Sequence, residues 1–335
     1  MQKSITLKQT GYEPLIDAVK AYAIVAVLIG HMVRIDQLAY GLWIDMQVPL
    51  FVLVQVFHVL KRDNSTFDFV KIFKRIILPY LIIQTLLFVS LLIISTPPLD
   101  NFNALIKNVL ICGGNGPGSY YPWVYVQLAI VIPLCRKLMS AYSDIKLAII
   151  FIILCEVFEI LSSVFSLSDY IHRLLAIRYL FLIYLGWIWV KHGIVLSKIT
   201  ILLSVLSMIS ILYFEYGPLD NEPWFFTTAW KTHRWPCYFY VSTLLTFVIC
   251  SLYHTLSNNG IIDRCIKLLS KCSYEIFLMQ MLILKVFPSL SFISDKYMRL
   301  GMRIFLMFVL SIVGGYYFNH VYNCFINKSK SNGLQ

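Results

Sequence analysis

The chain has 335 residues, of which 59% are hydrophobic and 13% are charged, and its formal net charge is +11. Soluble domains are about half apolar and about one quarter charged, so this composition excludes a soluble protein. Apolar runs close to the length of a membrane-crossing helix recur, whereas the alternating pattern of β-barrel strands is absent. We therefore expect an all-α integral membrane protein, a bundle of about ten transmembrane helices.

The positive charge lies in short loops beside the apolar runs. This placement is typical of topology signals and of contact with anionic lipids, and we expect no nucleic-acid partner. The 8 cysteines are scattered without C-x-x-C spacing, so we expect neither a disulfide framework nor a metal site. The first residues are polar and no small-residue cleavage site follows the first run, which predicts that the first helix is kept as an anchor.

The predicted spans form one membrane domain over residues 1–335. They lie near residues 14–34, 42–60, 76–95, 120–135, 146–164, 174–190, 198–214, 235–256, 273–290 and 301–322. About 17 loop cations fall on one predicted side and about 7 on the other, which by the positive-inside rule places both termini in the cytoplasm.

The first span carries a carboxylate, an ammonium and an imidazole group. Lys20 and His31 are 31 − 20 = 11 positions apart, so on an α-helix they lie within about 20° of each other around the axis and about 16 Å apart along it. Asp17 precedes Lys20 by one turn and can pair with it, and Arg34 follows His31. Ionisable groups are costly in hydrocarbon, so this stripe predicts a functional cavity. The alternative is a lysine that snorkels to one interface and a histidine at the other.

The second span contains polar side chains among large apolar residues. Gln47 and Gln55 are predicted to face the cavity. Pro49 is predicted to kink the helix, so that polar groups or water must satisfy the freed carbonyl. His58 adjoins basic residues and is interpreted as an interfacial histidine.

The segment 71–80, KIFKRIILPY, is the densest basic stretch. Basic side chains beside a span anchor lipid headgroups, and lysine and arginine also bind phosphate well. Both roles can hold at once, so we expect a cationic mouth for a cytosolic polyanion such as the phosphates of coenzyme A, with Lys74 and Arg75 in it.

An outer loop ends in GGNGPGSYYPWVYVQ at residues 113–127. The glycines lack the strand context and the Lys-Ser/Thr pair of a phosphate-binding loop, which excludes that motif. The aromatic residues suit an interfacial belt and also a platform on which a sugar stacks, and the belt is favoured for most of them. The candidate acceptor residues here are Tyr120, Tyr121, Trp123 and Gln127.

Later spans contribute a few more polar groups. Glu159 and Arg178 are expected at similar depth on antiparallel helices, and a buried ion pair is the favoured interpretation because an unpaired charge is costly there. A role in shaping the cavity is the alternative. Gln280 lies nearest the middle of the ninth span and is expected to meet the cavity.

Five segments follow one another in a recognisable order. The first is Asp17-x-x-Lys20 followed by His31. The others are VPLF at 48–51, KRIILPY at 74–80, YLGWIW at 184–189 and SYEIFLMQM at 273–281. Together they resemble the acyltransferase-3 family of multi-pass membrane acyltransferases, whose first span has a basic residue followed after ten positions by histidine.

The chain departs from the family pattern at three places. Lys20 stands where arginine is common, which keeps the charge and loses the bidentate geometry. Val54-Gln55 stands where Ser-Gly is usual, and Gln280 stands where the family has a late histidine. These departures bear on the donor and the acceptor rather than on the class.

The resemblance implies transfer of an acyl group, most simply acetyl from acetyl-CoA, to a sugar hydroxyl of a surface or exported glycan at the inner membrane, with a lipid-linked sugar as one form of acceptor. Histidine titrates near neutral pH, so His31 is expected to act as general base or as a transient acyl carrier. Lys20, positioned by Asp17, is expected to hold the donor. Their separation of about 16 Å is comparable to a pantetheine arm.

Two other classes fit part of the pattern. A glycan-lipid flippase or exporter would also have about ten spans and buried charges, but it would need no acyl-CoA. A membrane glycan polymerase is expected to have long outer loops with catalytic arginine or carboxylate groups, whereas the outer loops here are modest. Release of free thiol from acetyl-CoA in the presence of a glycan separates the three classes.

Overall fold

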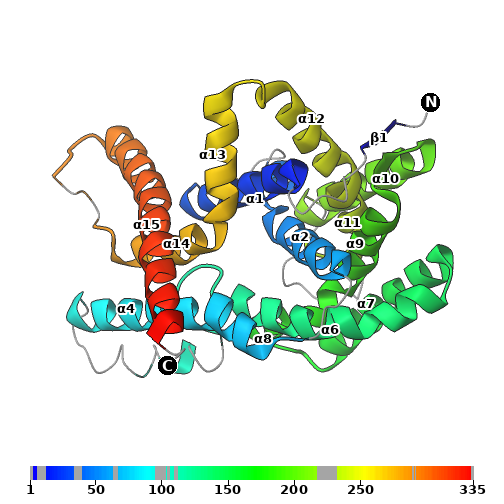
Figure 1. Cartoon of the computed structure of the whole chain (residues 1–335), viewed down its shortest axis with the longest axis horizontal. Helices are drawn as coiled ribbons and strands as arrows, with labels where there is room; N and C mark the ends of the chain where they lie inside the picture. Colours follow the sequence, from blue (N-terminus) through cyan, green and yellow to red (C-terminus); the bar gives the residue numbers. More distant parts are fainter. Residues whose placement is uncertain are drawn as a thin grey trace.

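The chain folds into an all-helical bundle, which confirms the predicted fold class (Figure 1). The computed structural model describes residues 3–5, 13–33, 40–62, 67–94, 103, 106–108, 112–216, 232–288, 290 and 292–332. Within these residues the strands form one short antiparallel ladder, in which β1 (Lys3–Ile5) pairs with β2 (Ile194–Leu196).

Helices make up most of the described chain. They are α1 (Pro14–Met32), α2 (Gln47–Lys61), α3 (Phe69–Ile72), α4 (Leu78–Ile94), α6 (Tyr121–Ala141), α7 (Asp144–Val164), α8 (Asp169–Leu174), α9 (Leu180–His192), α10 (Lys198–Tyr216), α11 (Tyr238–Tyr240), α12 (Thr246–Leu256), α13 (Gly260–Lys271), α14 (Ser273–Val286) and α15 (Lys296–Asn332). Single π-helical turns at Tyr40–Ile44, Phe73–Ile77 and Val241–Leu245 and short 3-10 turns at Ala176–Tyr179 and Trp235–Cys237 lie between them.

Eight helical segments in the described residues are long and apolar enough to cross a membrane. They are Pro14–Met32, Tyr40–Lys61, Phe69–Ile94, Tyr121–Ala141, Asp144–Val164, Lys198–Glu215, Trp235–Leu256 and Lys296–Ile326. Each of them overlaps a span predicted from the sequence, so the protein is a multi-pass membrane protein.

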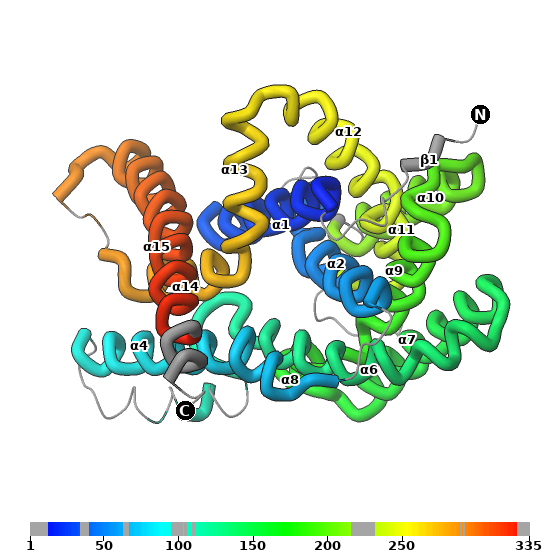
Figure 2. The backbone as a smooth tube through the Cα atoms, viewed as in Figure 1, coloured from blue at the N-terminus to red at the C-terminus, as the bar shows by residue number. Residues whose placement is uncertain are grey.

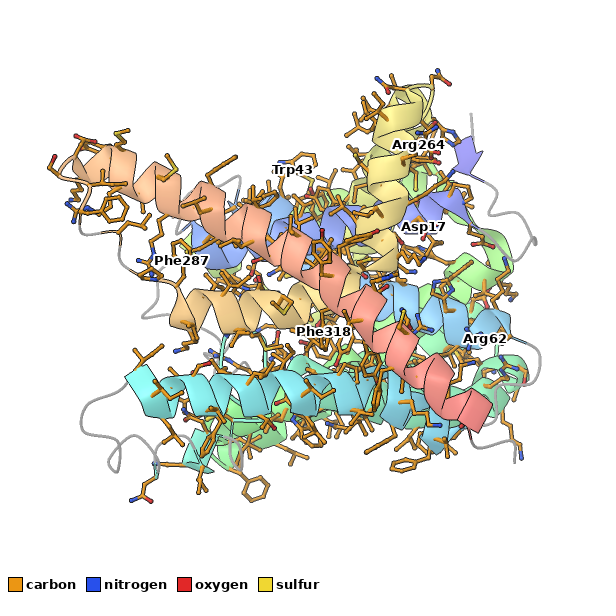
Figure 3. All side chains as sticks on the ribbon, turned by 60° about the vertical axis from the view of Figure 1, so that its left-hand side comes forward. Asp17, Trp43, Arg62, Arg264, Phe287 and Phe318 are labelled. Carbon is orange, nitrogen blue, oxygen red and sulfur yellow. The ribbon has the colours of Figure 1, made fainter. Side chains whose placement is uncertain are left out.

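The other two predicted spans, near residues 174–190 and 273–290, are shorter helices. α9 has 13 residues and α14 has 14, fewer than the roughly 20 that a straight crossing of the bilayer core requires. α9 packs between α2 and α7. α14 packs between α4 and α15 (Figure 3). Neighbouring helices therefore cover much of these two short helices.

α1 and α2 lie near the centre of the bundle, with later helices around them (Figure 2). α1 begins at Pro14, whose missing N–H is harmless in a first helical turn. Its Val19, Ile24 and Leu28 are fully buried, and the helix packs against α2, α12, α13 and α14. Polar residues of a helix in this position can reach water or a ligand only through internal space.

The span that contains α2 is interrupted before Pro49 rather than kinked at it. The π-helical turn Tyr40–Ile44 leads into a turn at Asp45 and Met46, and α2 begins at Gln47. Pro49 therefore lies in the first turn of α2, where no N–H donor is needed from it. The break leaves Asp45 in a turn at the start of the helix.

α13 lies outside every predicted span. Its sequence GIIDRCIKLLSK places apolar and charged residues on different sides of a helix, which is typical of a helix at a membrane surface. α13 packs against α1, and Ser270 of α13 donates a hydrogen bond to Asp17 of α1. In Figure 3, Asp17 lies beside α13, which also carries Arg264.

Candidate active site

A cavity of about 1930 Å³ lies within the bundle. Its walls come from α1, α2, the turns before α4, the loop before α6, and α13 and α14. Lys20 and His31 of α1 both line it, and a rise of about 1.5 Å per residue separates them by about 16 Å along the helix. The stripe predicted on the first span therefore faces an internal cavity rather than lipid. Arg34, the other candidate on this span, lies outside the described residues.

The predicted pair of Asp17 and Lys20 is present. Nζ of Lys20 lies 3.8 Å from Oδ1 of Asp17, and the same carboxylate oxygen accepts a hydrogen bond from the Ser270 hydroxyl. Asp17 thus fixes the lysine relative to α13. These two contacts explain why a carboxylate is tolerated on a largely apolar helix, because the ammonium group of Lys20 and the hydroxyl group of Ser270 compensate its charge.

Cationic side chains from seven parts of the described chain line the cavity. They are Lys20 of α1, Arg62 after α2, Lys71 and Arg75 before α4, Arg173 of α8, Lys267 and Lys271 of α13, Lys285 of α14 and Arg303 of α15. Lys74, the predicted companion of Arg75, is exposed and is not among the described residues that line the cavity. Consecutive residues of a helix point about 100° apart, so only one of the two faces inward.

α2 contributes three polar side chains to the wall. Gln47 and Gln55 line the cavity as predicted, and His58, interpreted from the sequence as interfacial, lines it too. Nε2 of Gln55 donates to the carbonyl oxygen of Tyr125 at 2.8 Å. In the described part of the chain, Oε1 of Gln47 and Oε1 of Gln55 are buried without a hydrogen-bond partner. These oxygens are available to accept hydrogen bonds from a ligand hydroxyl.

His31 is held by Gln280 of α14. Nε2 of Gln280 lies 2.7 Å from Nδ1 of His31, and the Gln280 side chain is 0% exposed. Gln280 is not among the described residues that line the cavity, so it meets the imidazole rather than the cavity space. In this orientation the amide nitrogen donates to Nδ1, and the ring proton lies on Nε2. With the amide group turned over, its oxygen instead accepts from Nδ1–H and leaves Nε2 free as an acceptor.

The aromatic segment divides into lining and supporting residues. Tyr120 and Tyr121 line the cavity, whereas Trp123 and Gln127 do not belong to its described lining. The indole N–H of Trp123 donates to the carbonyl oxygen of Gly113 at 2.8 Å. Gln127 donates to the last carbonyl oxygen of α8 at 2.6 Å. Trp123 and Gln127 therefore hold the backbone in place.

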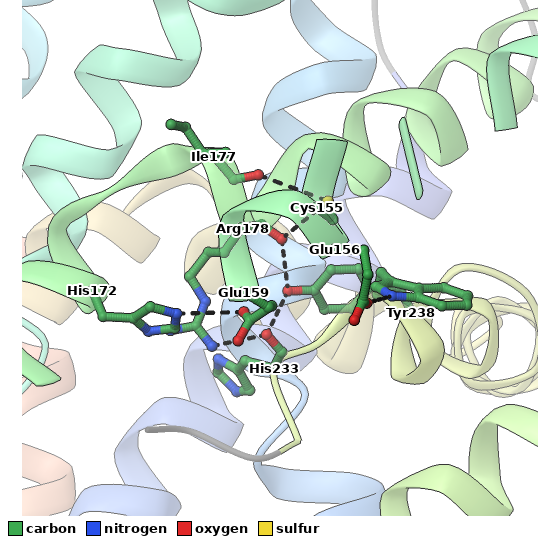
Figure 4. Close-up of polar contacts among 9 residues, drawn as sticks. Cys155, Glu156, Glu159, His172, Ile177, Arg178, His233 and Tyr238 are labelled. Atoms are coloured by element: carbon green, nitrogen blue, oxygen red, sulfur yellow. Dashed lines mark hydrogen bonds and ion pairs between the residues drawn. The ribbon is translucent and has the colours of Figure 1, made fainter. Parts of the chain in front are cut away.

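Glu159 and Arg178 belong to a buried polar network (Figure 4). His172 lies between them, with Nε2 3.4 Å from Oε1 of Glu159 and Nδ1 3.1 Å from a guanidinium nitrogen of Arg178. Arg178 and Tyr238 both donate to the carbonyl oxygen of His233, at 2.8 and 2.9 Å. Glu159 and Arg178 are absent from the described cavity lining, so they support its wall.

Asp45 and His233 both line the cavity and connect it to this network. Nε2 of His233 lies 2.7 Å from the carbonyl oxygen of Asp45 and 3.7 Å from its Oδ1, and the Thr232 hydroxyl donates to Oδ2. Neither Asp45 nor His233 was predicted as a site residue, because the contact joins positions 188 residues apart. No short motif carries a signal for such a pair.

The cavity therefore combines two kinds of chemistry. Several cations suit the phosphate groups of a polyanion. An imidazole with a fixed orientation suits proton transfer, and the neighbouring amides, hydroxyls and aromatic rings suit a polyol. A carboxylate beside Lys20 and a neutral amide beside His31 keep the two groups in different environments.

The fold and the cavity define a multi-pass membrane protein with an internal polar site. The acyltransferase-3 family model, described as an acyltransferase domain, matches residues 14–320. The chain belongs to this family and is an acyltransferase, which confirms the resemblance drawn from its motifs. No curated protein and no solved structure matches it.

Proposed function

We propose that the protein transfers an acetyl group from cytosolic acetyl-CoA to a sugar hydroxyl of a cell-surface or exported polysaccharide, at the inner (cytoplasmic) membrane. Membership of the acyltransferase-3 family supports acyl transfer from a donor to an acceptor. The observation that carries the proposal is that Lys20 and His31 of α1 line one cavity.

The cations bind the donor. Coenzyme A carries several phosphate groups, and side chains such as Lys20, Arg62 and Arg75 offer them charge-assisted hydrogen bonds. Asp17 orients Lys20. The pantetheine arm then runs along α1 toward His31, since the separation of about 16 Å is comparable to its length.

His31 acts as the general base. The sugar hydroxyl loses its proton to the imidazole as its oxygen attacks the thioester carbonyl carbon, and the imidazolium then returns a proton to the departing thiolate of coenzyme A. For this transfer the oxygen of the Gln280 amide accepts from Nδ1–H, which leaves Nε2 of the ring free to take the proton. The runner-up role for His31, a transient acyl carrier, gives the same net reaction in two steps.

The acceptor sugar binds beside the imidazole. Tyr120 and Tyr121 offer aromatic faces, and the amide oxygens of Gln47 and Gln55 accept hydrogen bonds from hydroxyl groups. This set suits the hydroxyl groups of a polyol.

The membrane orientation follows from charge. We place both termini and the cation-rich loops in the cytoplasm, where acetyl-CoA is available, because loop cations concentrate on that side. Lys71 and the exposed Lys74 contact anionic lipid headgroups in this arrangement. His31 then faces the opposite side, on which surface glycans are exposed.

The test uses the purified full chain in lipid nanodiscs with acetyl-CoA and polysaccharide isolated from the cells that produce the protein. We expect thiol release that depends on the polysaccharide, and a gain of acetyl groups on it by mass spectrometry. Succinyl-CoA in a parallel reaction identifies the donor. Retained transfer by a correctly inserted His31→Ala protein would contradict the mechanism, and no thiol release with either donor would contradict the proposed donor and acceptor.

A further inference from the structure

Four glycines in the loop before α6 have a backbone conformation that L side chains rarely adopt. The φ angle is +77° at Gly113, +132° at Gly114, +95° at Gly116 and +81° at Gly118. Glycine reaches positive φ without the steric cost that a Cβ imposes. The glycine-rich sequence is therefore required by the path of the backbone.

This loop lies against His31. A Cβ built on Gly118 would lie 3.8 Å from Cε1 of His31 and 2.7 Å from Cε2 of Phe277. Phe277 stands on α14, one turn before Gln280, the residue that contacts His31. One face of α14 therefore positions both the imidazole and the loop. Because Gly118 has no side chain, no Cβ fills the space between its backbone and the rings of His31 and Phe277.

Hydrogen bonds to α4 and within the loop itself fix the loop. Gln84 of α4 accepts a hydrogen bond from the N–H of Asn115 at 2.8 Å and donates to its carbonyl oxygen at 2.9 Å. The Ser119 hydroxyl donates to the carbonyl oxygen of Gly114 at 3.1 Å. Gln84 and Asn115 are 7% and 4% exposed, and hydrogen bonds in such surroundings are electrostatically stronger than in water.

Three N–H donors of this loop have no hydrogen-bond partner among the residues that the structure describes. They are the backbone N–H groups of Gly116 and Gly118 and the side-chain Nδ2 of Asn115. All three residues line the cavity. Gly116 and Gly118 are partly exposed, whereas Asn115 is 4% exposed. A buried donor in a folded protein is almost always paired, so the unpaired Nδ2 of Asn115 in the cavity wall indicates a partner that arrives with the substrate.

We propose that the loop Gly113–Ser119 is the oxyanion-binding element of the acyl transfer, with Gly116, Gly118 and Asn115 as its donors. The inference rests on the proposed function. As the sugar oxygen bonds to the carbonyl carbon, the C=O π pair moves onto the carbonyl oxygen and the hydroxyl proton goes to His31. On collapse, that pair re-forms C=O, the C–S bond breaks, and the thiolate takes the proton from His31.

The donors accelerate the reaction because they bind the intermediate more strongly than the substrate. A negatively charged oxygen forms stronger hydrogen bonds than a thioester carbonyl, and donors fixed in advance need no rearrangement when the charge appears. Removal of one such donor from an acyl-transfer enzyme lowers kcat about 100-fold to 1000-fold.

The experiment compares two donors in the same thiol-release assay with the isolated polysaccharide. One is acetyl-CoA, and the other is its dithioester analogue, in which sulfur replaces the carbonyl oxygen. N–H donors stabilise a charged oxygen more than a charged sulfur, so the unaltered protein should favour the oxygen donor. The measured quantity is the ratio of kcat for the oxygen donor to kcat for the sulfur donor.

Two variants test the loop. Asn115→Ala removes a donor, and Gln84→Met removes both hydrogen bonds that fix Asn115 while keeping the side-chain length. Each should lower kcat with acetyl-CoA about 100-fold and lower the oxygen-to-sulfur ratio with it. The matched control is Gln127→Met, since Gln127 clamps the backbone at Leu174 and Ala176 in the same way but off the described cavity wall.

The outcomes separate the inference from the proposed function. A ratio that falls in Gln84→Met or Asn115→Ala and holds in Gln127→Met supports the loop as an oxyanion-binding element. A ratio unchanged in every variant that folds overturns it, because a merely structural defect slows both donors equally. If Asn115→Ala fails to fold, Gln84→Met decides. No thiol release by the unaltered protein overturns the proposed function and this inference together.

Discussion

The Lys20 and His31 parts of the cavity are built in different ways, although both residues stand on α1. Around Lys20, most of the lining cations are exposed, among them Arg62, Arg75 and Lys267. Around His31, the supporting side chains are buried: Gln280 is 0% and Gln84 is 7% exposed. One part relies on several charges, and the other on a few fixed contacts.

This contrast predicts different tolerance to change. Charge attraction acts over several ångströms and is shared by several groups, so the loss of one cation should have a graded effect. Proton transfer requires heavy atoms within about 3 Å, so the loss of one group near His31 should be severe. The contrast also assigns the effects to different kinetic constants, KM for the cations and kcat for the imidazole and its support.

The largest expected effect follows from removal of the imidazole. His31→Ala should lower kcat about 1000-fold, since general-base catalysis contributes roughly 100-fold to 10,000-fold. The matched control is His320→Ala, at an exposed position of α15, which should leave kcat unchanged. The measurement is thiol release from acetyl-CoA with polysaccharide present, on protein shown to be correctly inserted.

The next effect tests the support of the imidazole. Gln280→Glu places a carboxylate against His31, which favours the protonated ring. The base must be neutral to act, so activity near pH 7 should fall and recover as the pH rises. Gln280→Met should lower kcat at every pH without moving the pH profile. The check is the pH profile of kcat, and identical profiles for the two variants would remove Gln280 from the proton-transfer geometry.

A smaller effect is expected among the cations. Arg75→Met should raise the KM for acetyl-CoA about tenfold, which corresponds to about 1.4 kcal/mol, with kcat nearly unchanged. Its neighbour Lys74 provides the control, since it lies off the described cavity lining and Lys74→Met should leave KM unaltered. The difference should shrink at high salt, because ions screen exposed charges. Equal effects of the two substitutions would show a general response to surface charge.

The smallest effect on activity is expected in the buried network. Glu159→Gln removes the carboxylate that meets His172 and should destabilise the fold by about 2 kcal/mol, the cost of a partly unsatisfied buried network. Glu156→Gln is the comparison, because Glu156 is more exposed and binds Trp235. Thermal unfolding in detergent measures the difference. If Glu159→Gln lowers kcat strongly in protein that remains folded, Glu159 has a direct part in the reaction.

Local pattern was sufficient for the helices and for the stripe on α1. Membrane spans are recognisable because a bilayer demands long apolar helices, and eight predicted spans reappear as helices of adequate length. The pair of Asp17 and Lys20 was predictable because both residues stand on one helix at a fixed spacing. The shared face of Lys20 and His31 follows from the same periodicity.

Several site residues could not be found in this way. Asp45 and His233 meet across 188 positions, and α13 brings Lys267 and Lys271 to the cavity from a helix that no span predicted. Trp123 and Gln127 were candidate acceptor residues, and in the structure their side chains bind backbone carbonyl groups away from the described cavity lining. Aromatic and amide side chains suit both roles, so composition could not separate them.

The sequence by itself determined the class of protein, the positions of most helices and the common face of Lys20 and His31, because these depend on hydrophobicity and on the geometry of one helix. Only the tertiary structure decided that this face borders a cavity, that Gln280 meets the imidazole and that the glycine loop lies beside it. These features arise from packing between helices, and packing is set by the joint shape of many residues far apart in the chain.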